Sequence, residues 1–390
     1  MPAKASVSFR ILRPESLSPT PSDPLVSEII CAAEFSGSGP ARELEHRLAE
    51  LSFTRRVRLK KGPLFFVRWN LPLSQAEALS IHLKSMPELA RQIQTALRAY
   101  LADGFWELKG RGNRKWMWTR KTLVMGILNV TPDSFSDGGK HLDPSSAVER
   151  ALKMQDDGAD WIDVGGESSR PGAKAVTARE EKKRILPVLK ACVKALRVPL
   201  SVDTYKSEVA RAAVGEGAQM VNDIGALRLD QRMGRTIAAL KVPVILMHMQ
   251  GEPRTMQKNP TYQEVVGDVI RFFRERIDFA KKCGIREDRI LVDPGFGFGK
   301  TPWHNIELTR RLWEFKVLGK PIVIGPSLKS TLGFLLGGAP PEERREATGA
   351  ALTASILQGA DWVRVHDVKA AVRVVKIADA IRYDRGLTAP

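Results

Sequence analysis

From Leu123 onward, the sequence alternates between short apolar stretches, typical of buried strands, and amphipathic stretches with helical spacing. The expected helices include residues 145–159, 177–196, 207–218 and 264–284. The expected strands end near eight positions: Asn129, Gly165, Asp203, Asp223, His248, Asp293, Gly325 and His366. Eight such units in about 270 residues are typical of a closed (β/α)8 barrel, the TIM barrel.

An open, doubly wound sheet is the alternative fold. It usually has fewer strands, and it would need a Gly-rich dinucleotide-binding turn, which follows none of the expected strands. We therefore predict an α/β protein, a (β/α)8 TIM barrel preceded by a small α+β N-terminal domain.

The N-terminal domain is expected over residues 1–117 and the barrel over 118–390. Residues 6–12 and 62–72 have strand character, and residues 41–53 have helical spacing. Residues 73–101 also have helical spacing and would form two helices that meet near Pro87. This domain carries no motif that indicates its role.

Residues 105–120 interleave Trp106, Trp116 and Trp118 with basic side chains. One interpretation is a surface on which nucleic-acid bases stack. The other is a hairpin that turns at residues 110–113 and covers the floor of the barrel. We favour the hairpin.

The formal net charge of +17 raises the question of a nucleic-acid partner. Residues 1–120 carry +8 and residues 121–390 carry the remaining +9, so the excess is not concentrated in one tail or helix. An anionic small substrate explains the charge as well, and we expect no nucleic-acid partner.

No stretch approaches the roughly 20 apolar residues that span a bilayer, and the first residues do not read as a secretory signal. We therefore expect no membrane partner. Cys31, Cys192 and Cys283 are widely separated and fit neither a metal site nor an even set of disulfides. A reducing cytoplasm is the expected location.

Polar side chains gather at the expected carboxyl ends of the strands. Alone, each has an ordinary explanation, since an Asp after a strand is often the N-cap of the next helix. In a barrel, however, these ends converge on one pocket. The set is Asn129, Glu167, Ser168, Ser169, Arg170, Asp203, Asn222, Asp223, His248, Asp293, Lys329, Ser330, Arg364 and His366.

The first strand and its loop, residues 125–139, read MGILNVTPDSFSDGG. This segment closely resembles the signature of dihydropteroate synthase. Residues 162–173, 201–204, 221–224, 246–253, 292–301 and 363–368 resemble the same family in the same order. The resemblance covers roughly residues 121–385. In that family, a 7,8-dihydropterin bearing a hydroxymethyl diphosphate condenses with p-aminobenzoate, which releases diphosphate and forms dihydropteroate.

The resemblance implies roles for individual residues. Asp203, Asn222 and Asp293 would pair with the polar edges of the pterin, and Lys329 would close that pocket. Arg364, Val365 and His366 would hold the diphosphate, and Asn129 would be a ligand of Mg²⁺, which prefers oxygen ligands. Asp203 would stabilise the pterin methylene cation that forms when the C–O bond breaks. The implied catalytic residues are thus Asp203, Lys329, Arg364 and His366.

The resemblance also implies a p-aminobenzoate site, part of which lies on the first two loops. An Arg can pair with a benzoate carboxylate, although either Arg170 or a loop amide could do so here. The implied lining is Phe135, Ser169, Arg170, Pro171, Phe298 and Ser330. A homodimer and sensitivity to sulfonamides are further implications.

This chain departs from the family at residues 325–330, which read GPSLKS where the family usually reads G-x-S-R-K-S. Leu328 therefore replaces the customary Arg. If that Arg contacts substrate, its loss affects affinity; if it makes a surface ion pair, its loss costs roughly 0–1 kcal/mol. The sequence leaves both alternatives open.

Two other functions remain as alternatives: a methyltetrahydrofolate-dependent methyltransferase and a non-catalytic pterin-binding paralogue. A methyltransferase needs no diphosphate site. The run Arg364-Val365-His366 and the polar loop of residues 131–139 therefore favour the synthase.

Overall fold

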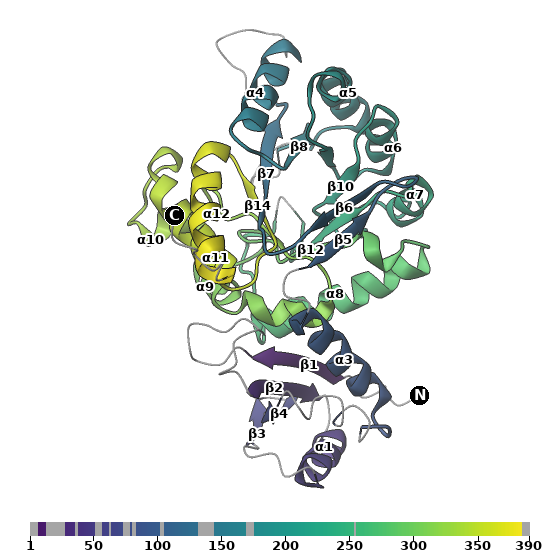
Figure 1. Ribbon diagram of the computed structural model, residues 1–390, viewed down its shortest axis with the longest axis vertical. Helices are drawn as coiled ribbons and strands as arrows, with labels where there is room; N and C mark the ends of the chain where they lie inside the picture. Colours follow the sequence, from purple (N-terminus) through teal and green to yellow (C-terminus); the bar gives the residue numbers. More distant parts are fainter. Residues whose placement is uncertain are drawn as a thin grey trace, which may run out of the picture. The chain divides into compact units, whose positions relative to one another are not determined.

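The computed structural model describes residues 7–12, 28–35, 38–50, 57–61, 64–72, 79, 83–101, 105–131, 144–168, 175–252 and 255–383. The chain divides into two compact units (Figure 1). Unit 1 is Met1–Gly104 with Arg311–Gly319, and unit 2 is Phe105–Arg310 with Lys320–Pro390.

Unit 2 contains a ring of parallel strands. Sheet order runs β12-β11-β10-β9-β8-β7-β14-β13, and a parallel bridge between Val292 and Ile322 joins the two ends. The strands are β7 (Leu123–Asn129), β8 (Trp161–Gly165), β9 (Leu200–Asp203), β10 (Met220–Asp223), β11 (Val244–Met247), β12 (Ile290–Asp293), β13 (Val323–Ile324) and β14 (Trp362–Val365). The predicted TIM barrel is confirmed, and each strand ends at the expected residue or one before it.

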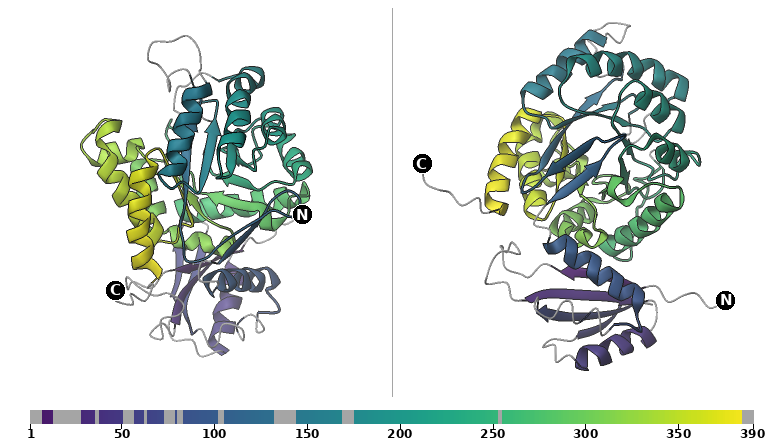
Figure 2. Two further views of the ribbon diagram at one scale, coloured as in Figure 1. Left: turned by 45° about the horizontal axis from the view of Figure 1, so that its top comes forward. Right: turned by 45° about the vertical axis from the view of Figure 1, so that its right-hand side comes forward.

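Helices surround the strands, as the right-hand view of Figure 2 shows. They are α4 (Pro144–Asp156), α5 (Ala178–Ala195), α6 (Ser207–Gly215), α7 (Met233–Leu240), α8 (Val265–Lys282), α9 (Pro302–Arg310), α10 (Ser330–Leu335), α11 (Arg345–Leu357) and α12 (Val368–Tyr383). Short 3-10 turns lie at η3 (Glu287–Arg289) and η5 (Pro341–Glu343). On α5, Ile185, Leu189 and Cys192 form one buried stripe at helical spacing, while the remaining face is largely charged. Among the described residues, no helix is long and apolar enough to cross a membrane.

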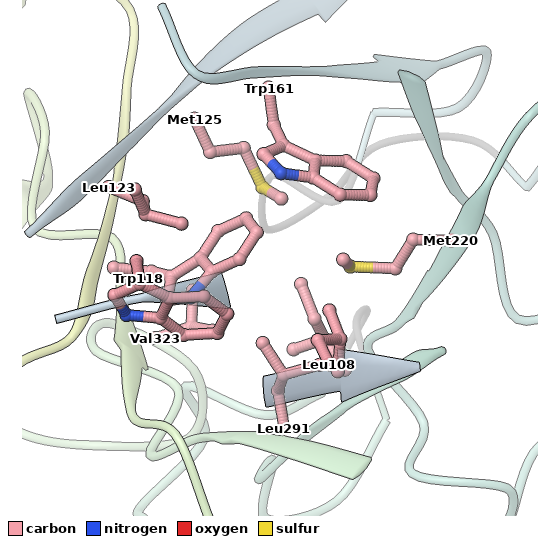
Figure 3. Close-up of a cluster of buried hydrophobic side chains, with 10 residues drawn as sticks. Leu108, Trp118, Leu123, Met125, Trp161, Met220, Leu291 and Val323 are labelled. Atoms are coloured by element: carbon pink, nitrogen blue, oxygen red, sulfur yellow. The ribbon is translucent and has the colours of Figure 1, made fainter. Parts of the chain in front are cut away.

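The Trp-rich segment forms an antiparallel hairpin of β5 (Trp106–Lys109) and β6 (Lys115–Trp118), as expected. Its Trp118 and Leu108 join a buried apolar cluster with inward side chains of the barrel strands, among them Met125, Trp161 and Leu291 (Figure 3). The hairpin therefore closes the barrel floor. Because of this packing, the hairpin belongs to the barrel unit, and the boundary between the units lies at Gly104 rather than near residue 117.

Unit 1 is a small α+β unit. Its antiparallel sheet has the order β1-β2-β4-β3, from β1 (Val7–Leu12), β2 (Glu28–Phe35), β4 (Leu64–Pro72) and β3 (Val57–Lys61). Helices α1 (Ser38–Glu50) and α3 (Pro87–Leu101) accompany it, together with the 3-10 turn η4 (Leu312–Leu318). The sequence analysis did not identify β2 and β3. Of the two helices expected over residues 73–101, the second is α3, which begins at Pro87, and most of residues 73–82, where the first was expected, lie outside the described residues.

Candidate active site at the carboxyl ends of the strands

Above the apolar floor, the inward side chains of the barrel become polar. Alternate residues of a strand share one face, so a step of two residues moves one layer along the barrel interior. On four strands this step changes an apolar side chain to a polar or charged one: Trp161 to Asp163, Met220 to Asn222, Leu291 to Asp293, and Trp362 to Arg364. The polar layer thus lies directly on the hydrophobic floor.

Asp163 lies at the centre of this polar layer and is fully buried. Its Oδ2 accepts hydrogen bonds from Asn222 Nδ2 at 2.9 Å and from Arg364 Nε at 2.7 Å. Its Oδ1 accepts from Ser201 Oγ at 2.6 Å. Arg364 Nη2 then donates to Asp203 Oδ2 at 2.7 Å. The structure therefore brings together three of the residues named from sequence, through an acid that the sequence analysis missed.

The electrostatics of this layer disfavour unpaired negative charge. Burial raises the pKa of Asp203 to about 7, although Arg364 opposes the shift. The neighbouring carboxylates Asp163 and Glu181 add to the rise. Burial likewise raises the pKa of Asp293 to about 6. Shifted carboxyl groups in a cleft are typical of functional sites.

Lys329 lies beside this layer, at the carboxyl side of β13. Its Nζ lies 4.1 Å from the centroid of the Phe298 ring, within the range of a cation–π contact. Its charge also affects Asp203 and Asp293, lowering the pKa of each. The next residue, Ser330, is exposed at the start of α10.

Leu328, at the position of the customary Arg, adopts a left-handed backbone conformation with φ of 58°. Its N–H donates to Thr348 Oγ1 at 3.1 Å, and its carbonyl accepts from Arg344 Nη1 at 3.0 Å. These contacts hold the main chain next to Lys329 in place, and the Leu328 side chain is half-buried.

Arg364 lies on the inward face of β14, and His366 follows directly after the strand ends at Val365. The His366 N–H and ring Nδ1 both lie within hydrogen-bonding distance of Ser327 Oγ, at 3.2 and 3.1 Å. Val365, between them, is buried and faces away from the interior because side chains alternate along a strand. Only the main chain of Val365 can therefore contact a ligand in the barrel.

Asn129 ends β7 beside the Asp203 side chain. Both side chains border Gly165, where a Cβ would lie 3.7 Å from Asp203 Oδ2 and 3.8 Å from Asn129 Oδ1, in ordinary van der Waals contact with each. Two oxygen donors facing one small space fit a hard cation that retains other oxygen ligands. Among the described residues, no group of three or more His, Cys, Asp or Glu gathers as a metal site.

Three expected strand-end residues have structural roles instead. The carboxylate of Asp223 accepts from the N–H groups of Gly225 and Leu227, both at 2.8 Å, and so shapes its own loop. Glu167 forms an ion pair with Lys206 and accepts from Tyr205 Oη at 3.2 Å.

His248, the third, is buried, and its Nδ1 lies 2.8 Å from Nζ of the buried Lys300. Lys300 also donates to the carbonyl of Phe298 at 2.9 Å. Burial lowers the pKa of Lys300 to about 7. Lys300 therefore connects the loop after β12 to the end of β11. After Asp163, it is a second residue that the sequence analysis missed.

The sequence contained one signal for Asp163. A carboxylate inside the apolar strand WIDVG is costly to bury unless it is paired, so it predicts polar partners on other strands. Phe135, Ser169, Arg170 and Pro171 lie outside the described residues, and the structure says nothing of them.

Comparison with known proteins agrees with this geometry. The family model described as "Pterin binding enzyme" matches residues 125–366. A dihydropteroate synthase of Synechocystis is 45% identical over 264 residues, which cover 68% of this chain and 91% of that protein. The dihydropteroate synthase of Escherichia coli K12 is 46% identical over 257 residues, covering 66% and 90%.

A solved structure gives the same result at the level of the fold. Xanthomonas albilineans dihydropteroate synthase with 4-aminobenzoic acid superimposes with a TM-score of 0.64 at 44% identity. The match covers 70% of this chain and 96% of that one. The relatives therefore correspond to the barrel, and most of the residues outside the match precede it.

Proposed function

Because the chain belongs to the dihydropteroate synthase family of pterin-binding enzymes, we propose that it joins 6-hydroxymethyl-7,8-dihydropterin diphosphate to p-aminobenzoate. The products are 7,8-dihydropteroate and diphosphate. The observation that carries the proposal is the polar layer on the barrel floor, where Asn222 Oδ1 is buried without a hydrogen-bond partner among the described residues.

The pterin would lie on this layer. Its ring carries several N–H donors and acceptors, which a buried site must satisfy to retain affinity. Asn222 Oδ1 would accept one ring N–H, and the Asp293 carboxylate would accept others. Lys329 would donate to the ring acceptors from its position over Phe298.

The reaction exchanges one bond for another at the pterin methylene carbon. The C–O bond to diphosphate breaks, and its electron pair leaves with the diphosphate. The aniline nitrogen of p-aminobenzoate then forms the C–N bond and releases a proton. Arg364 and His366 would bind the diphosphate, and Asp203, when Arg364 turns toward phosphate, would offer its negative charge to the cationic carbon.

Mg²⁺ would be held by Asn129 Oδ1 together with diphosphate oxygens and water, in the space beside Gly165. Bound there, the cation would neutralise charge on the leaving diphosphate. Phe298 and Ser330 would contribute to the p-aminobenzoate site, along with Ser169 and Arg170 of the second loop.

The decisive assay measures both products. Purified protein with Mg²⁺ should release diphosphate and form dihydropteroate in equal amounts, and only when both substrates are present. Diphosphate release that does not depend on p-aminobenzoate, or protein that binds pterin without turnover, would contradict the proposal. Loss of turnover in excess EDTA, restored by Mg²⁺, is expected from the metal assignment.

We also propose that the barrel forms a homodimer through an apolar patch on α9 and α10, made of Trp303, Phe334, Leu335 and Leu336. These side chains are 49–65% exposed, and the rings of Trp303 and Phe334 are in edge contact with centroids 6.3 Å apart. Contiguous exposed apolar side chains commonly mark interaction surfaces.

Light scattering on a size-exclusion column measures the molar mass of the protein and so tests the dimer. Phe334→Asp with Leu336→Asp should give a monomer. Met117→Asp, which places one negative charge at an exposed apolar residue of the hairpin, should leave the dimer intact. A dimer that survives the double substitution would rule out this patch.

The three cysteines are free thiols, which is compatible with the cytoplasm as the place of action.

A further inference from the structure

We propose that Asp163 is a positioning residue that fixes the orientation of the Asn222 amide and the direction of the Arg364 guanidinium. This inference rests on the proposed function. Asp163 is fully buried in β8, in the same polar layer as Asn222, and none of the roles above requires it to contact substrate.

The first part of the argument concerns Asn222. An amide can turn its oxygen or its nitrogen toward a neighbour, and the two orientations differ in what they offer a ligand. A carboxylate only accepts, so the atom that faces Asp163 Oδ2 at 2.9 Å must be Nδ2. Asn222 Oδ1 then points elsewhere, and it is buried without a partner among the described residues.

An unpaired buried oxygen is costly in the free protein, and a ligand N–H removes that cost. Asp163 therefore decides that this position of the site accepts a hydrogen bond. A ring that presents N–H to Asn222 is favoured, and a ring that presents an unprotonated nitrogen or a carbonyl is rejected.

The second part concerns Arg364. Its Nε donates to Asp163 Oδ2 at 2.7 Å, while its Nη2 donates to Asp203 at 2.7 Å. When a diphosphate draws the outer part of the guanidinium away from Asp203, the Nε bond to Asp163 can remain. Asp163 would thus act as the pivot about which Arg364 turns between Asp203 and phosphate.

The test uses the full-length protein and two pterin ligands. Binding of 6-hydroxymethyl-7,8-dihydropterin, which lacks phosphate, reports on Asn222. The KM of its diphosphate reports on both Asn222 and Arg364. Asp163→Asn has nearly the same shape but can donate to Asn222 Oδ1 and turn that amide. We expect Asp163→Asn to weaken binding of 6-hydroxymethyl-7,8-dihydropterin, the pterin alcohol, by at least about tenfold.

An exchanged pair separates orientation from packing. In the double variant Asp163→Asn with Asn222→Asp, the donor lies on residue 163 and the carboxylate on residue 222, so an acceptor again faces the ligand. Affinity for the pterin alcohol should recover to within about threefold of wild type. This is a smaller loss than the tenfold expected when the acceptor is missing. The KM of the diphosphate should stay raised, because the uncharged amide introduced at position 163 replaces the carboxylate that pairs with Arg364 Nε.

Asp379→Asn is the matched control, since Asp379 is a buried carboxylate on α12 that accepts from the N–H and Oγ1 of Thr122. It should lower the melting temperature without changing pterin affinity. Wild-type affinity in Asp163→Asn would overturn the proposal. So would a loss of pterin-binding free energy in the exchanged pair that equals the sum of the losses in Asp163→Asn and Asn222→Asp alone. So would failure of both Asp163→Asn and the exchanged pair to fold. Absence of pterin binding by the wild-type protein would instead contradict the proposed function.

Discussion

Asp293 illustrates how burial at the scale of one residue sets a pH dependence. Burial raises its pKa to about 6, and in its proposed role the ionised carboxylate is the better acceptor for ring N–H donors. We therefore expect affinity for 6-hydroxymethyl-7,8-dihydropterin to rise as pH increases from 5 to 7. Calorimetry across that range measures it, and Asp293→Asn should flatten the rise. An unchanged slope in Asp293→Asn would show that another group titrates.

Lys300 is a buried cation whose titration affects the stability of the fold. Burial lowers its pKa to about 7 in the folded protein, whereas an unfolded lysine titrates near 10.4. Between these values the unfolded chain binds more protons, so the free energy of unfolding should increase as pH rises.

The increase from this one group should reach up to about 3 kcal/mol between pH 7 and pH 9. Urea unfolding at both pH values measures it. Lys300→Met cannot titrate and should show a smaller increase. It should also be less stable at pH 9, because the carbonyl of Phe298 loses its donor. Parallel pH curves for the two proteins would contradict the assignment.

At the scale of elements, the loop after β12 is packed against the end of β11 with no space for a side chain. Gly295 has φ of 70°, and a Cβ there would lie 1.9 Å from the carbonyl oxygen of His248. Gly295→Ala should therefore cost several kcal/mol, or displace the loop that carries Phe298.

Gly215→Ala, in α6, is the control for this substitution because nothing lies within 4 Å of its Cβ position. It should be neutral or stabilising by up to about 1 kcal/mol. Thermal unfolding and pterin binding of both variants test the comparison. A Gly295→Ala protein with wild-type stability and affinity would mean that the loop is not held in this conformation.

The floor hairpin makes a polar contact beside its apolar cluster. Trp106 Nε1 donates to Asp361 Oδ1 at 2.9 Å, and the other oxygen of this buried carboxylate accepts from the N–H of Ile322. Trp106→Phe retains most of the ring but removes the donor, so we expect a loss of about 1–3 kcal/mol in the free energy of unfolding.

Activity at low temperature should be unchanged in Trp106→Phe, since the hairpin lies at the other end of the barrel from the site. Denaturant unfolding and kcat measured on the same preparation separate the two effects. A selective loss of kcat at full stability would show that the floor influences the site.

Across the molecule, the proposed catalytic residues lie in unit 2, whereas most of unit 1 precedes the family match. The barrel that begins at Phe105 should therefore retain dihydropteroate synthesis. Its stability should fall, because Leu312, Phe315 and Leu318 of η4 are buried and η4 packs with β1 and α3 within unit 1.

Steady-state kinetics and unfolding of residues 105–390, beside the full chain, measure both effects. Without β1 and α3, the apolar side chain of Phe315 is expected to become exposed and to promote aggregation of the shortened chain. Phe315→Ser should reduce that aggregation. A shortened protein that is folded by circular dichroism yet inactive would show that unit 1 contributes to catalysis.

The barrel and the polar residues at its mouth follow from the local pattern of the sequence. Alternating strand and helix periods are local properties of the main chain, and the closing of eight parallel strands brings their polar ends together whatever lies between. Asn129, Asp203, Asn222 and Asp293 could therefore be placed at strand ends before any contact was known. The hairpin groups with the barrel rather than with the residues before it because the packing of Trp118 and Leu108 depends on strands far away in the sequence.

Only the tertiary structure decided which polar groups face the ligand and which hold the scaffold. Asp223 and His248 read in sequence like site residues, but their partners are loop N–H groups and Lys300. Asp163 read as an interior strand residue, but its partners Asn222 and Arg364 are 59 and 201 residues away. Hydrogen bonds across such separations depend on the stagger of neighbouring strands, which the pattern of one strand does not encode.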